Sequence, residues 1–460
     1  MVTWRVAALL CLGAATLPWW PQPWLGLIVV TGTVVALASV DVAMAAPLRD
    51  LALRRDGDRT CWLGGSATVT LRLRNGSRRQ LRAQLRDAWP PSATARPGAD
   101  PVVPSGPGPR AHASSSGPVP VAGVVWHVDL APGETAALPA VLTPTRHGDR
   151  LAGPVGVRSF GPLRLAFRQH HQRPATPRWT LRVLPRFDSR RLLPEKVARL
   201  RVIDGMRAAR GRGQGTEFDN LREYVVGDDV RSIDWRASAR RTDLLVRTWR
   251  PERDRRVVVV LDTGRTAAVR IGDQTRLDVA IDAGLLLASL AHRAGDQVDL
   301  LAVDATVRAA VAGAGRQVLL PRLVDALAPL QPTLVETDFE LVAGEVLRRE
   351  RKRALVVLCT ALEPGALGDG LLPVLPRLAA RHQVVVAAVR DPALTDLTTT
   401  PVREIDDVYA AAAAWRTITE RDRVAAALSR HGVLVMDAPA PAFASRLADI
   451  YLHLKLLGRL

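Results

Sequence analysis

Asp262 is the residue of this sequence best placed to do chemistry. It directly follows the apolar run Val257–Leu261, and Thr266 comes four residues later. A continuous apolar run of this kind is typical of a buried parallel strand, and parallel α/β domains bind ligands at the carboxyl ends of their strands. A carboxylate and a hydroxyl at that position offer the hard oxygen ligands that Mg²⁺ takes. The alternative is that Asp262 caps the following loop through hydrogen bonds and holds no metal.

A second stretch, between residues 228 and 240, mixes carboxylates with arginines and a tryptophan. Such a mixture indicates a salt-bridge network that fixes a connector, with the tryptophan as its apolar anchor. It also suits a partner-docking surface, because Arg and Trp often dominate binding at interfaces. A catalytic carboxylate pair is the third interpretation, although no His or Cys lies nearby to act with it. The residues predicted to bind a partner are Asp228, Asp229, Arg231, Asp234, Trp235 and Arg240.

From about residue 255 onward, short apolar runs alternate with helical patterns. Strands that alternate with helices predict an α/β fold with a doubly wound parallel sheet. Such a sheet would place Asp262 at its carboxyl edge. The expected strands are Val257–Asp262, Val298–Val303, Ala354–Cys359, Val384–Val389 and Val433–Met436, and the expected helices are Pro321–Leu327, Phe339–Arg349, Leu371–Ala380, Val424–Leu428 and Phe443–Leu457.

Residues 48 to 185 instead show the alternating polarity of β-strands. Val69–Leu73 and Leu81–Leu85 alternate apolar with polar residues, and Asn75-Gly76 between them predicts a hairpin. Many short strands separated by turns favour a small β-sandwich.

The N-terminus carries two apolar runs, Val6–Leu17 and Trp24–Ala46, separated by a segment rich in Pro and Trp. Prolines end helices and tryptophans favour the membrane–water interface, so we expect a transmembrane helical hairpin. Arginines precede the first run and follow the second, whereas the tip has none; both ends should therefore face the cytoplasm. The rival is a cleaved signal peptide ending at Ala43-Met44-Ala45, but the apolar stretch is too long and is interrupted by prolines.

The stretch from Gly213 to Arg240, followed by Leu244, Val246 and Glu252, closely resembles the signature of a bacterial family catalogued as domain of unknown function number fifty-eight. The anchor, the β region and the α/β domain occur in that family's order. Its members are similar to von Willebrand factor A-like proteins and are often encoded beside MoxR-type AAA+ ATPases. The resemblance therefore implies a chaperone or assembly role with such an ATPase as partner.

The von Willebrand factor A fold carries a metal-ion-dependent adhesion motif, Asp-x-Ser-x-Ser, after its first strand. Asp262 matches it and Thr266 can replace the second serine, whereas Gly264 has no side chain. The resemblance assigns the hydroxyl of a second loop to Thr337. A third loop has Ala361 where Asp is expected, and Glu363 is the carboxylate that could compensate for it. We therefore predict no bound cofactor. The alternative is Mg²⁺ at Asp262, Thr266 and Thr337, and Arg265 could supply positive charge in place of a cation.

Charge and cysteine content indicate which kinds of partner and which cellular compartment suit this protein. Lys plus Arg number 63 against 45 Asp plus Glu, a formal net charge of +18. Arginine codons of a GC-rich genome explain this excess, and contact with anionic lipid or an acidic partner is the sharper alternative. Neither zinc-ligand spacing nor an aromatic RNA-binding motif points to nucleic acid. The three scattered cysteines favour a reducing compartment.

Together these patterns predict four parts: a transmembrane hairpin at 1–47, a β-sandwich-like domain at 48–185, the signature connector at 186–254, and a von Willebrand factor A-like α/β domain at 255–460. The expected function is a non-enzymatic, membrane-anchored adaptor or chaperone component that works with a MoxR-type AAA+ ATPase in the cytoplasm. Two alternatives stay open: an extracytoplasmic metal-dependent adhesin, and a hydrolase that uses the acidic stretch.

Overall fold

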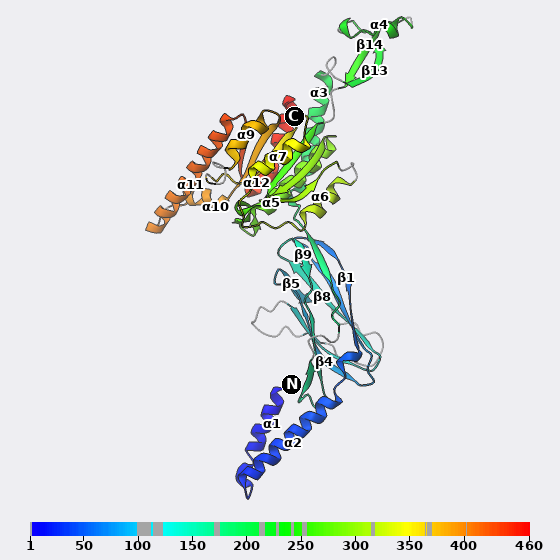
Figure 1. The fold of residues 1–460 in the computed structure, drawn as a ribbon, viewed down its shortest axis with the longest axis vertical. Coiled ribbons are helices and arrows are strands. Elements are labelled where there is room, and N and C mark those ends of the chain that lie inside the picture. The colour runs from blue at the N-terminus through cyan, green and yellow to red at the C-terminus, as the bar shows by residue number, and fades with distance from the viewer. Residues whose placement is uncertain are drawn as a thin grey trace. The chain divides into compact units, whose positions relative to one another are not determined.

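The computed structural model describes residues 2–98, 112–113, 123–169, 175–210, 217–226, 230–240, 243–250, 255–313, 318–363, 365, 370–401 and 403–460. The chain divides into two compact units, Met1–Leu184 and Pro185–Leu460 (Figure 1).

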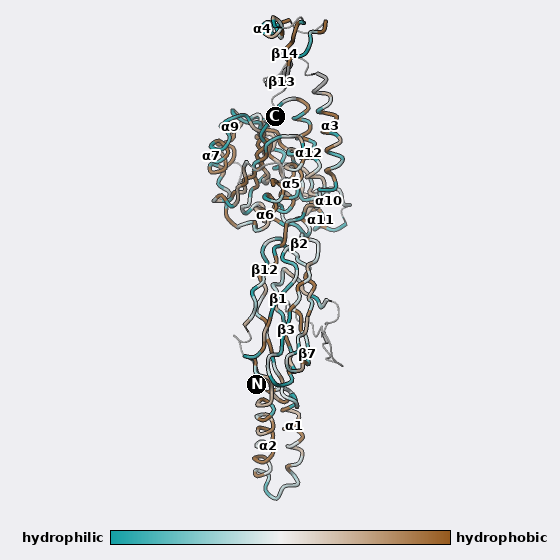
Figure 2. Tube along the Cα trace, turned by 90° about the vertical axis from the view of Figure 1, so that its right-hand side faces the viewer, coloured by the Kyte–Doolittle hydropathy of each residue, from teal (hydrophilic) through white to brown (hydrophobic). Residues whose placement is uncertain are grey.

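The first unit begins with two apolar helices, α1 (Trp4–Ala14) and α2 (Pro23–Met44), joined through the short 3₁₀ helix η1 (Leu17–Trp19). α2 starts at Pro23, whose fixed φ suits a first helical turn, and is hydrophobic along most of its length (Figure 2). At about 1.5 Å per residue its 22 residues cover the roughly 30 Å of a bilayer core. The segment Pro23–Asp50 is long and apolar enough to cross a membrane by length and composition. α1 has 11 residues and is too short for that, so the described residues support one of the two predicted spans.

Asp41, the one charge inside the apolar run of α2, is buried and bonded to the β region. Its carboxylate accepts hydrogen bonds from the backbone N–H groups of Leu163, Leu165 and Ala166 at 2.7, 2.7 and 3.0 Å. These bonds join the helix end to the loop between two strands. The predicted boundary at residue 47 therefore does not separate two units, because α2 and the β region belong to one compact body.

The β region contains two main sheets and one smaller sheet. Leu71, Leu73 and Leu138 from one main sheet pack against Leu85 and Trp126 from the other in a single buried cluster, as expected of a sandwich. The four-stranded sheet has the order β1 (Leu51–Gly57), β3 (Ala67–Asn75), β8 (Thr135–Pro144), β5 (Ala93–Pro97); the five-stranded sheet has β11 (Phe167–Gln169), β10 (Val155–Phe160), β4 (Leu81–Ala88), β7 (Gly123–Leu130), β6 (His112–Ala113); the third has β2 (Thr60–Trp62), β12 (Thr180–Leu184), β9 (Gly148–Leu151).

The predicted hairpin at Asn75-Gly76 is wrong. β3 pairs with β1 and β8, whereas β4 pairs with β7 and β10, so the chain crosses between the two sheets at this turn. The reason is that Asn75 is fully buried. Its side-chain amide donates to the backbone oxygens of Arg79, Leu130 and Ala131 instead of supporting a two-residue turn.

The second unit is built on a six-stranded sheet with the order β19, β18, β15, β20, β21, β22. β18, β15, β20, β21 and β22 run parallel, and only the edge strand β19 is antiparallel. The central strands read as continuous apolar runs because both of their faces are buried. Their bounds are β15 (Arg256–Asp262), β18 (Gln297–Val303), β19 (Val307–Val311), β20 (Leu355–Cys359), β21 (Gln383–Arg390) and β22 (Leu434–Pro439).

Helices cover both faces of this sheet (Figure 1). On one face, α7 (Phe339–Arg349) and α9 (Leu372–Ala379) pack against alternate strand residues, among them Val258 and Val356. On the other face, α5 (Arg276–Arg293) lies over β15, where Gly284 closely approaches Val259. Other helices of the body among the described residues are α3 (Leu193–Arg210), α6 (Leu319–Leu327) and α12 (Ala440–Leu457). The expected α/β content and alternation are confirmed.

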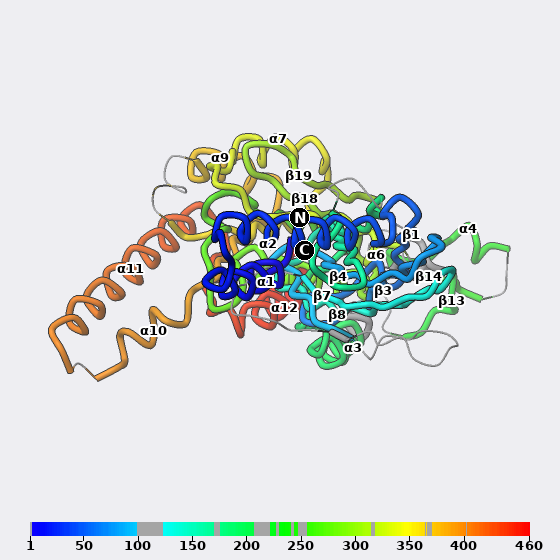
Figure 3. The backbone as a smooth tube through the Cα atoms, turned by 90° about the horizontal axis from the view of Figure 1, so that it is seen from below, coloured from blue at the N-terminus to red at the C-terminus, as the bar shows by residue number. Residues whose placement is uncertain are grey.

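Two further helices project from the carboxyl edge of the sheet. α10 (Pro392–Thr399) begins directly after β21, and α11 (Ile405–Arg430) returns to β22. Figures 1 and 3 show the first part of α11 extending away from the sheet and its flanking helices. Its last part is fixed to the body by Arg421, which is buried and contacts Asp437 at 2.6 Å. The sequence pattern predicted only Val424–Leu428 of this helix.

The family-signature stretch forms its own small element. β13 (Glu217–Glu223) pairs antiparallel with β14 (Leu245–Arg250), and the short helix α4 (Trp235–Ser238) lies in the connection between them. Ile233 forms an antiparallel bridge to Val246, and both side chains are buried. The stretch is thus a hairpin with a folded connection.

Candidate functional site

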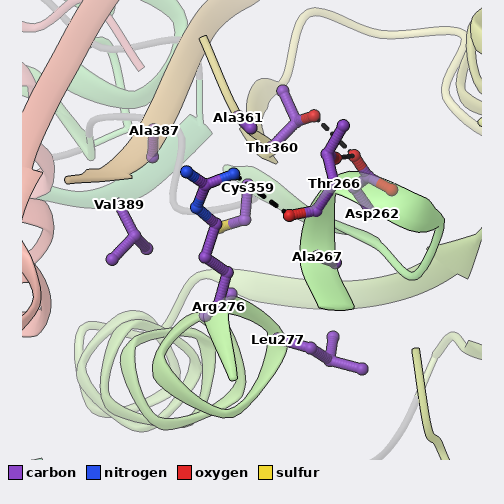
Figure 4. A pocket seen from close by; sticks show the side chains of 11 residues that line it. Asp262, Thr266, Ala267, Arg276, Leu277, Cys359, Thr360, Ala361, Ala387 and Val389 are labelled. Atoms are coloured by element: carbon purple, nitrogen blue, oxygen red, sulfur yellow. Dashed lines mark hydrogen bonds between the residues drawn. The ribbon is translucent and has the colours of Figure 1, made fainter. Parts of the chain in front are cut away.

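Asp262 lies at the carboxyl end of β15 and is almost fully buried. Its Oδ1 accepts hydrogen bonds from the Gly264 backbone N–H at 2.8 Å and from the Thr337 hydroxyl at 2.5 Å. Its Oδ2 accepts from the Thr266 and Thr360 hydroxyls at 3.0 and 2.6 Å. Figure 4 shows Thr266 and Thr360 facing this carboxylate. We call Asp262 with these three threonines the carboxylate cluster.

The structure brings together the three predicted residues of this site, Asp262, Thr266 and Thr337, and adds Thr360. The sequence carried a signal for Thr360. It follows β20 directly, and the parallel register pairs Leu261 with Cys359, so the next residues of the two strands become neighbours. That signal can be used only once β15 and β20 are known to be adjacent, because the two residues lie 98 positions apart.

The arginine beside the cluster is Arg276, at the start of α5, and not Arg265. Arg276 donates to the Thr266 backbone oxygen at 3.1 Å and pairs with Glu363 at 2.7 Å. Arg265 is half exposed and pairs with Glu336 at 2.7 Å on the surface. The suggested replacement of a cation by Arg265 is therefore wrong. Glu363, proposed as a compensating ligand, is instead the partner of Arg276.

A second carboxylate at the same edge is held in the same way. Asp304 follows β18 and is buried. It accepts hydrogen bonds from the Thr306 backbone N–H at 2.9 Å and from the Thr333 hydroxyl at 2.8 Å. Burial acts to raise the pKa of Asp304, but these hydrogen bonds outweigh it and hold the pKa below its ordinary value. Strand-end carboxylates with hydroxyl and backbone donors thus fix two loops of this edge.

The space beside the carboxylate cluster is small. The cavity lined by Asp262, Thr266, Arg276, Cys359 and neighbouring apolar residues has a volume of about 10 Å³ (Figure 4). A single water molecule needs roughly 10–15 Å³ on this measure. The cavity therefore has no room for an organic substrate.

The donor set does not fit a tightly held Mg²⁺. The cluster has one carboxylate, and each of its oxygens already accepts two hydrogen bonds from the protein. The guanidinium of Arg276 adds positive charge nearby. A serine side chain in place of Gly264 has no space, because its Cβ would overlap the Thr337 hydroxyl and lie 2.8 Å from the Val335 backbone oxygen. Within the described ranges, no group of three or more His, Cys, Asp or Glu side chains is arranged for a metal.

Restoring the missing serine should therefore damage the site rather than complete it. Gly264→Ser is expected to lower the free energy of unfolding of the α/β domain by about 1–3 kcal/mol, because Thr337 and Val335 must shift to admit the side chain. Denaturant unfolding of the full chain measures this. Gly344→Ser is the matched control: Gly344 has open space around its Cβ position in α7, and serine is the better helix former. A Gly264→Ser protein as stable as the control would contradict the crowding.

Cys359 offers a test of how closed the site is. It lines the same cavity and is buried. Burial raises the pKa of its thiol to about 12, and the nearby Asp262 carboxylate makes a smaller contribution in the same direction. Since the thiolate is the reactive form, only about one thiol in ten thousand is ionised at pH 8. In a Cys11→Ser/Cys61→Ser background, we expect no iodoacetamide labelling of the native protein at pH 8 within hours and full labelling in denaturant. Equal rates in both states would show that the edge is open.

The signature residues occupy a different place. Asp234 caps α4 by accepting from the backbone N–H groups of Arg236 and Ala237 at 3.1 and 3.0 Å. Trp235 is 64% exposed, so its predicted role as an apolar anchor is wrong. That anchor consists of Ile233, Leu245 and Val246, which are buried. Arg231 and Arg240 are exposed, and Asp228 and Asp229 lie outside the described residues. Asp234 therefore has a structural role as the N-cap of α4.

The site thus belongs to an α/β domain with a mainly parallel sheet, in which threonine hydroxyls donate hydrogen bonds to buried carboxylates at the strand ends. Residues 220–432 match the family described as "Protein of unknown function DUF58". Two mycobacterial proteins described as uncharacterized, one from Mycobacterium tuberculosis and one from Mycobacterium bovis, are each 29% identical over 187 residues. The match covers 39% of this chain and 56% of each relative.

Among solved structures, the chain is similar to a non-cellulosomal cohesin from Archaeoglobus fulgidus, with 10% identity and a TM-score of 0.20, over 29% of this chain and 91% of that one. It is also similar to a GH20 exo-β-N-acetylglucosaminidase from Vibrio harveyi, with 9% identity and a TM-score of 0.23, over 84% and 75%. At these scores neither likeness supports an argument about fold or function.

Proposed function

We propose that this protein is a membrane-anchored adaptor whose von Willebrand factor A-like domain binds a protein partner at the carboxyl edge of its sheet and carries out no catalysis. The partner that the sequence resemblance favours is a MoxR-type AAA+ ATPase. α2 serves as the anchor, α1 beside it completes a hairpin, and the rest of the chain lies in the cytoplasm.

The observation that carries this proposal is an apolar stripe on the projecting part of α11. At 100° per residue, Ile405, Val408, Tyr409 and Trp415 fall within an arc of about 120° on one face of the helix, and all four are exposed. Tyr409 is 70% exposed and Trp415 57%. Aromatic side chains of this kind frequently supply most of the energy of a protein–protein interface.

The chemistry of the surroundings favours a protein over a bilayer as the occupant of this stripe. Glu404, Asp406 and Asp407 lie at the start of the same helix, and an anionic membrane surface would repel them. Leu334 and Val335, beside the carboxylate cluster, add exposed apolar side chains on the same edge of the domain. The sequence favours the strand-end loops around Asp262, Thr266 and Thr337 as the partner surface. Burial of Asp262 and Thr266 moves the expected contacts to these exposed neighbours.

The absence of room for a substrate beside Asp262 is the main support for the non-enzymatic part of the proposal. The two carboxylates of this edge have their acceptor positions filled by threonines and backbone N–H groups. A carboxylate so satisfied is poorly suited to take a proton from a substrate. It is well suited to hold loops in one conformation for a partner.

A pull-down of the full chain from native membranes tests the proposal. With a C-terminal affinity tag, the chain should recover an AAA+ ATPase of the MoxR type, more strongly in one of the two conditions with and without ATP. A variant truncated between residues 392 and 430 is not suitable as control, because Arg421 and Leu428 belong to the core. Recovery of no ATPase in either condition, from membranes that contain one, would count against the partner.

A further inference from the structure

The first unit contains a second cavity, at the C-terminal end of α2. It is lined by Met44, Arg79, Gln80, Arg82, Phe160 and Pro162 and has a volume of about 340 Å³. We propose that this cavity binds the phosphate headgroup of an anionic membrane phospholipid. The inference rests on the proposed anchoring by α2.

The position of the cavity is fixed relative to α2. Met44 is the last residue of that helix. The buried carboxylate of Asp41 ties the helix end to the loop that contains Pro162, through three backbone N–H groups. If α2 spans the bilayer, the cavity therefore opens at the level where lipid headgroups begin.

Four arginines gather around this end of the helix, and backbone oxygens position their guanidinium groups. Arg79 donates to the backbone oxygen of Ala43 and Arg168 to that of Val42 at 2.8 Å. Arg82 donates to Pro162 at 3.0 Å and Arg5 to Leu163 at 3.2 Å. Carbonyl oxygens orient these groups without neutralising their charge.

Only one of these arginines has an acidic partner among the described residues. Arg82 lies 3.6 Å from Asp129, and Asp129 also accepts from Gln80 at 2.7 Å. Arg5, Arg79 and Arg168 form no ion pair with any carboxylate in the part of the chain that the structure describes. The site therefore carries net positive charge close to the expected bilayer surface, where each arginine favours anionic lipid.

The lining combines the two kinds of surface that a phospholipid headgroup presents. Arg79 and Arg82 supply planar guanidinium groups, which suit phosphate oxygens. Met44, Phe160 and Pro162 supply apolar wall toward the helix, where the glycerol and first acyl carbons of a lipid would lie. A free phosphate would use only the arginines, so the apolar wall and the position at the end of α2 favour the lipid.

The test uses the full chain in nonionic detergent, titrated with phosphatidylglycerol or phosphatidylcholine and observed by native mass spectrometry. The wild-type chain should retain phosphatidylglycerol in preference to phosphatidylcholine. Arg79→Gln/Arg82→Gln should weaken phosphatidylglycerol binding at least about tenfold. Arg96→Gln/Arg178→Gln, which removes the same charge from exposed positions that do not line the cavity, should leave binding unchanged.

Arg82→Gln alone guards against a folding defect, since the partners of the Arg82 side chain among the described residues are Asp129 and the exposed Pro162. It should weaken binding several-fold in a protein with a native circular dichroism spectrum. Equal loss in both double variants, or equal retention of the two lipids, would overturn the site. Displacement of the lipid by millimolar inorganic phosphate would show a soluble-phosphate site and also overturn it. Carbonate extraction of native membranes separately tests the anchor. Release of the wild-type chain would reject anchoring by α2, whereas the lipid selectivity is measured independently of that result.

Discussion

Replacing Asp262 by alanine is expected to lower the free energy of opening of β15 and β20 by about 3–5 kcal/mol. The carboxylate accepts from Gly264, Thr266, Thr337 and Thr360, and alanine would leave four donors in a buried site without their acceptor. Hydrogen–deuterium exchange of the full chain in detergent measures this, because it reports each strand separately and does not require the two units to unfold together.

Two variants make the result specific to the hydrogen bonds of Asp262. Asp262→Asn keeps the volume and one acceptor oxygen, so we expect a smaller loss of about 1–2 kcal/mol. Asp325→Ala removes an exposed carboxylate from α6 and should change the exchange of these strands by less than about 0.5 kcal/mol. If Asp262→Ala behaved like Asp325→Ala, the carboxylate cluster would not hold the edge of the sheet, and the adaptor account would lose its structural basis.

The double substitution Tyr409→Ala/Trp415→Ala is expected to weaken binding of the partner by about a hundredfold or more. Each aromatic side chain is exposed on the apolar stripe of α11, and central aromatic residues of an interface commonly contribute about 2 kcal/mol or more. The stability of the domain should change little, because neither side chain belongs to its core. Titration of the purified ATPase against the full chain in nanodiscs, by surface plasmon resonance, gives the dissociation constants.

The control for the stripe is Asp406→Ala/Thr417→Ala. Both positions lie on α11 but away from the stripe, by the 100° rotation per residue of an α-helix. This variant should bind within about twofold of the wild type. Equal binding by the stripe variant and the control would place the partner elsewhere, and the exposed Trp235 of the signature hairpin would then be the next surface to substitute.

The elements that could be predicted from the sequence are those with a strong internal pattern. The run from Val257 indicated β15, and helical spacing gave α7 with its observed bounds, Phe339–Arg349. Most of α11 was missed because Ala414 is the one buried residue of this helix before Arg421, and its large apolar residues are exposed, so no apolar stripe faces the core. The antiparallel edge strand β19 was also missed, since its residues are mostly exposed.

The candidate site was predicted in part. The position of Asp262 after an apolar run was enough to select it, and the resemblance supplied Thr266 and Thr337. Thr360 and Arg276 depend on strand order and on the position of α5, which local patterns do not encode. The turn at Asn75-Gly76 failed for a related reason: a two-residue signal cannot show that the flanking strands belong to different sheets.

The most direct test of the central claim, that a partner docks on the carboxyl edge of the α/β domain, is site-specific photo-crosslinking in native membranes. A photoreactive phenylalanine is placed at Tyr409, and for comparison at Leu151, which is exposed on the β region. We expect a crosslinked product with a MoxR-type AAA+ ATPase, identified by mass spectrometry, from position 409 and none from position 151. A crosslink to the ATPase from position 151 and none from position 409 would contradict it.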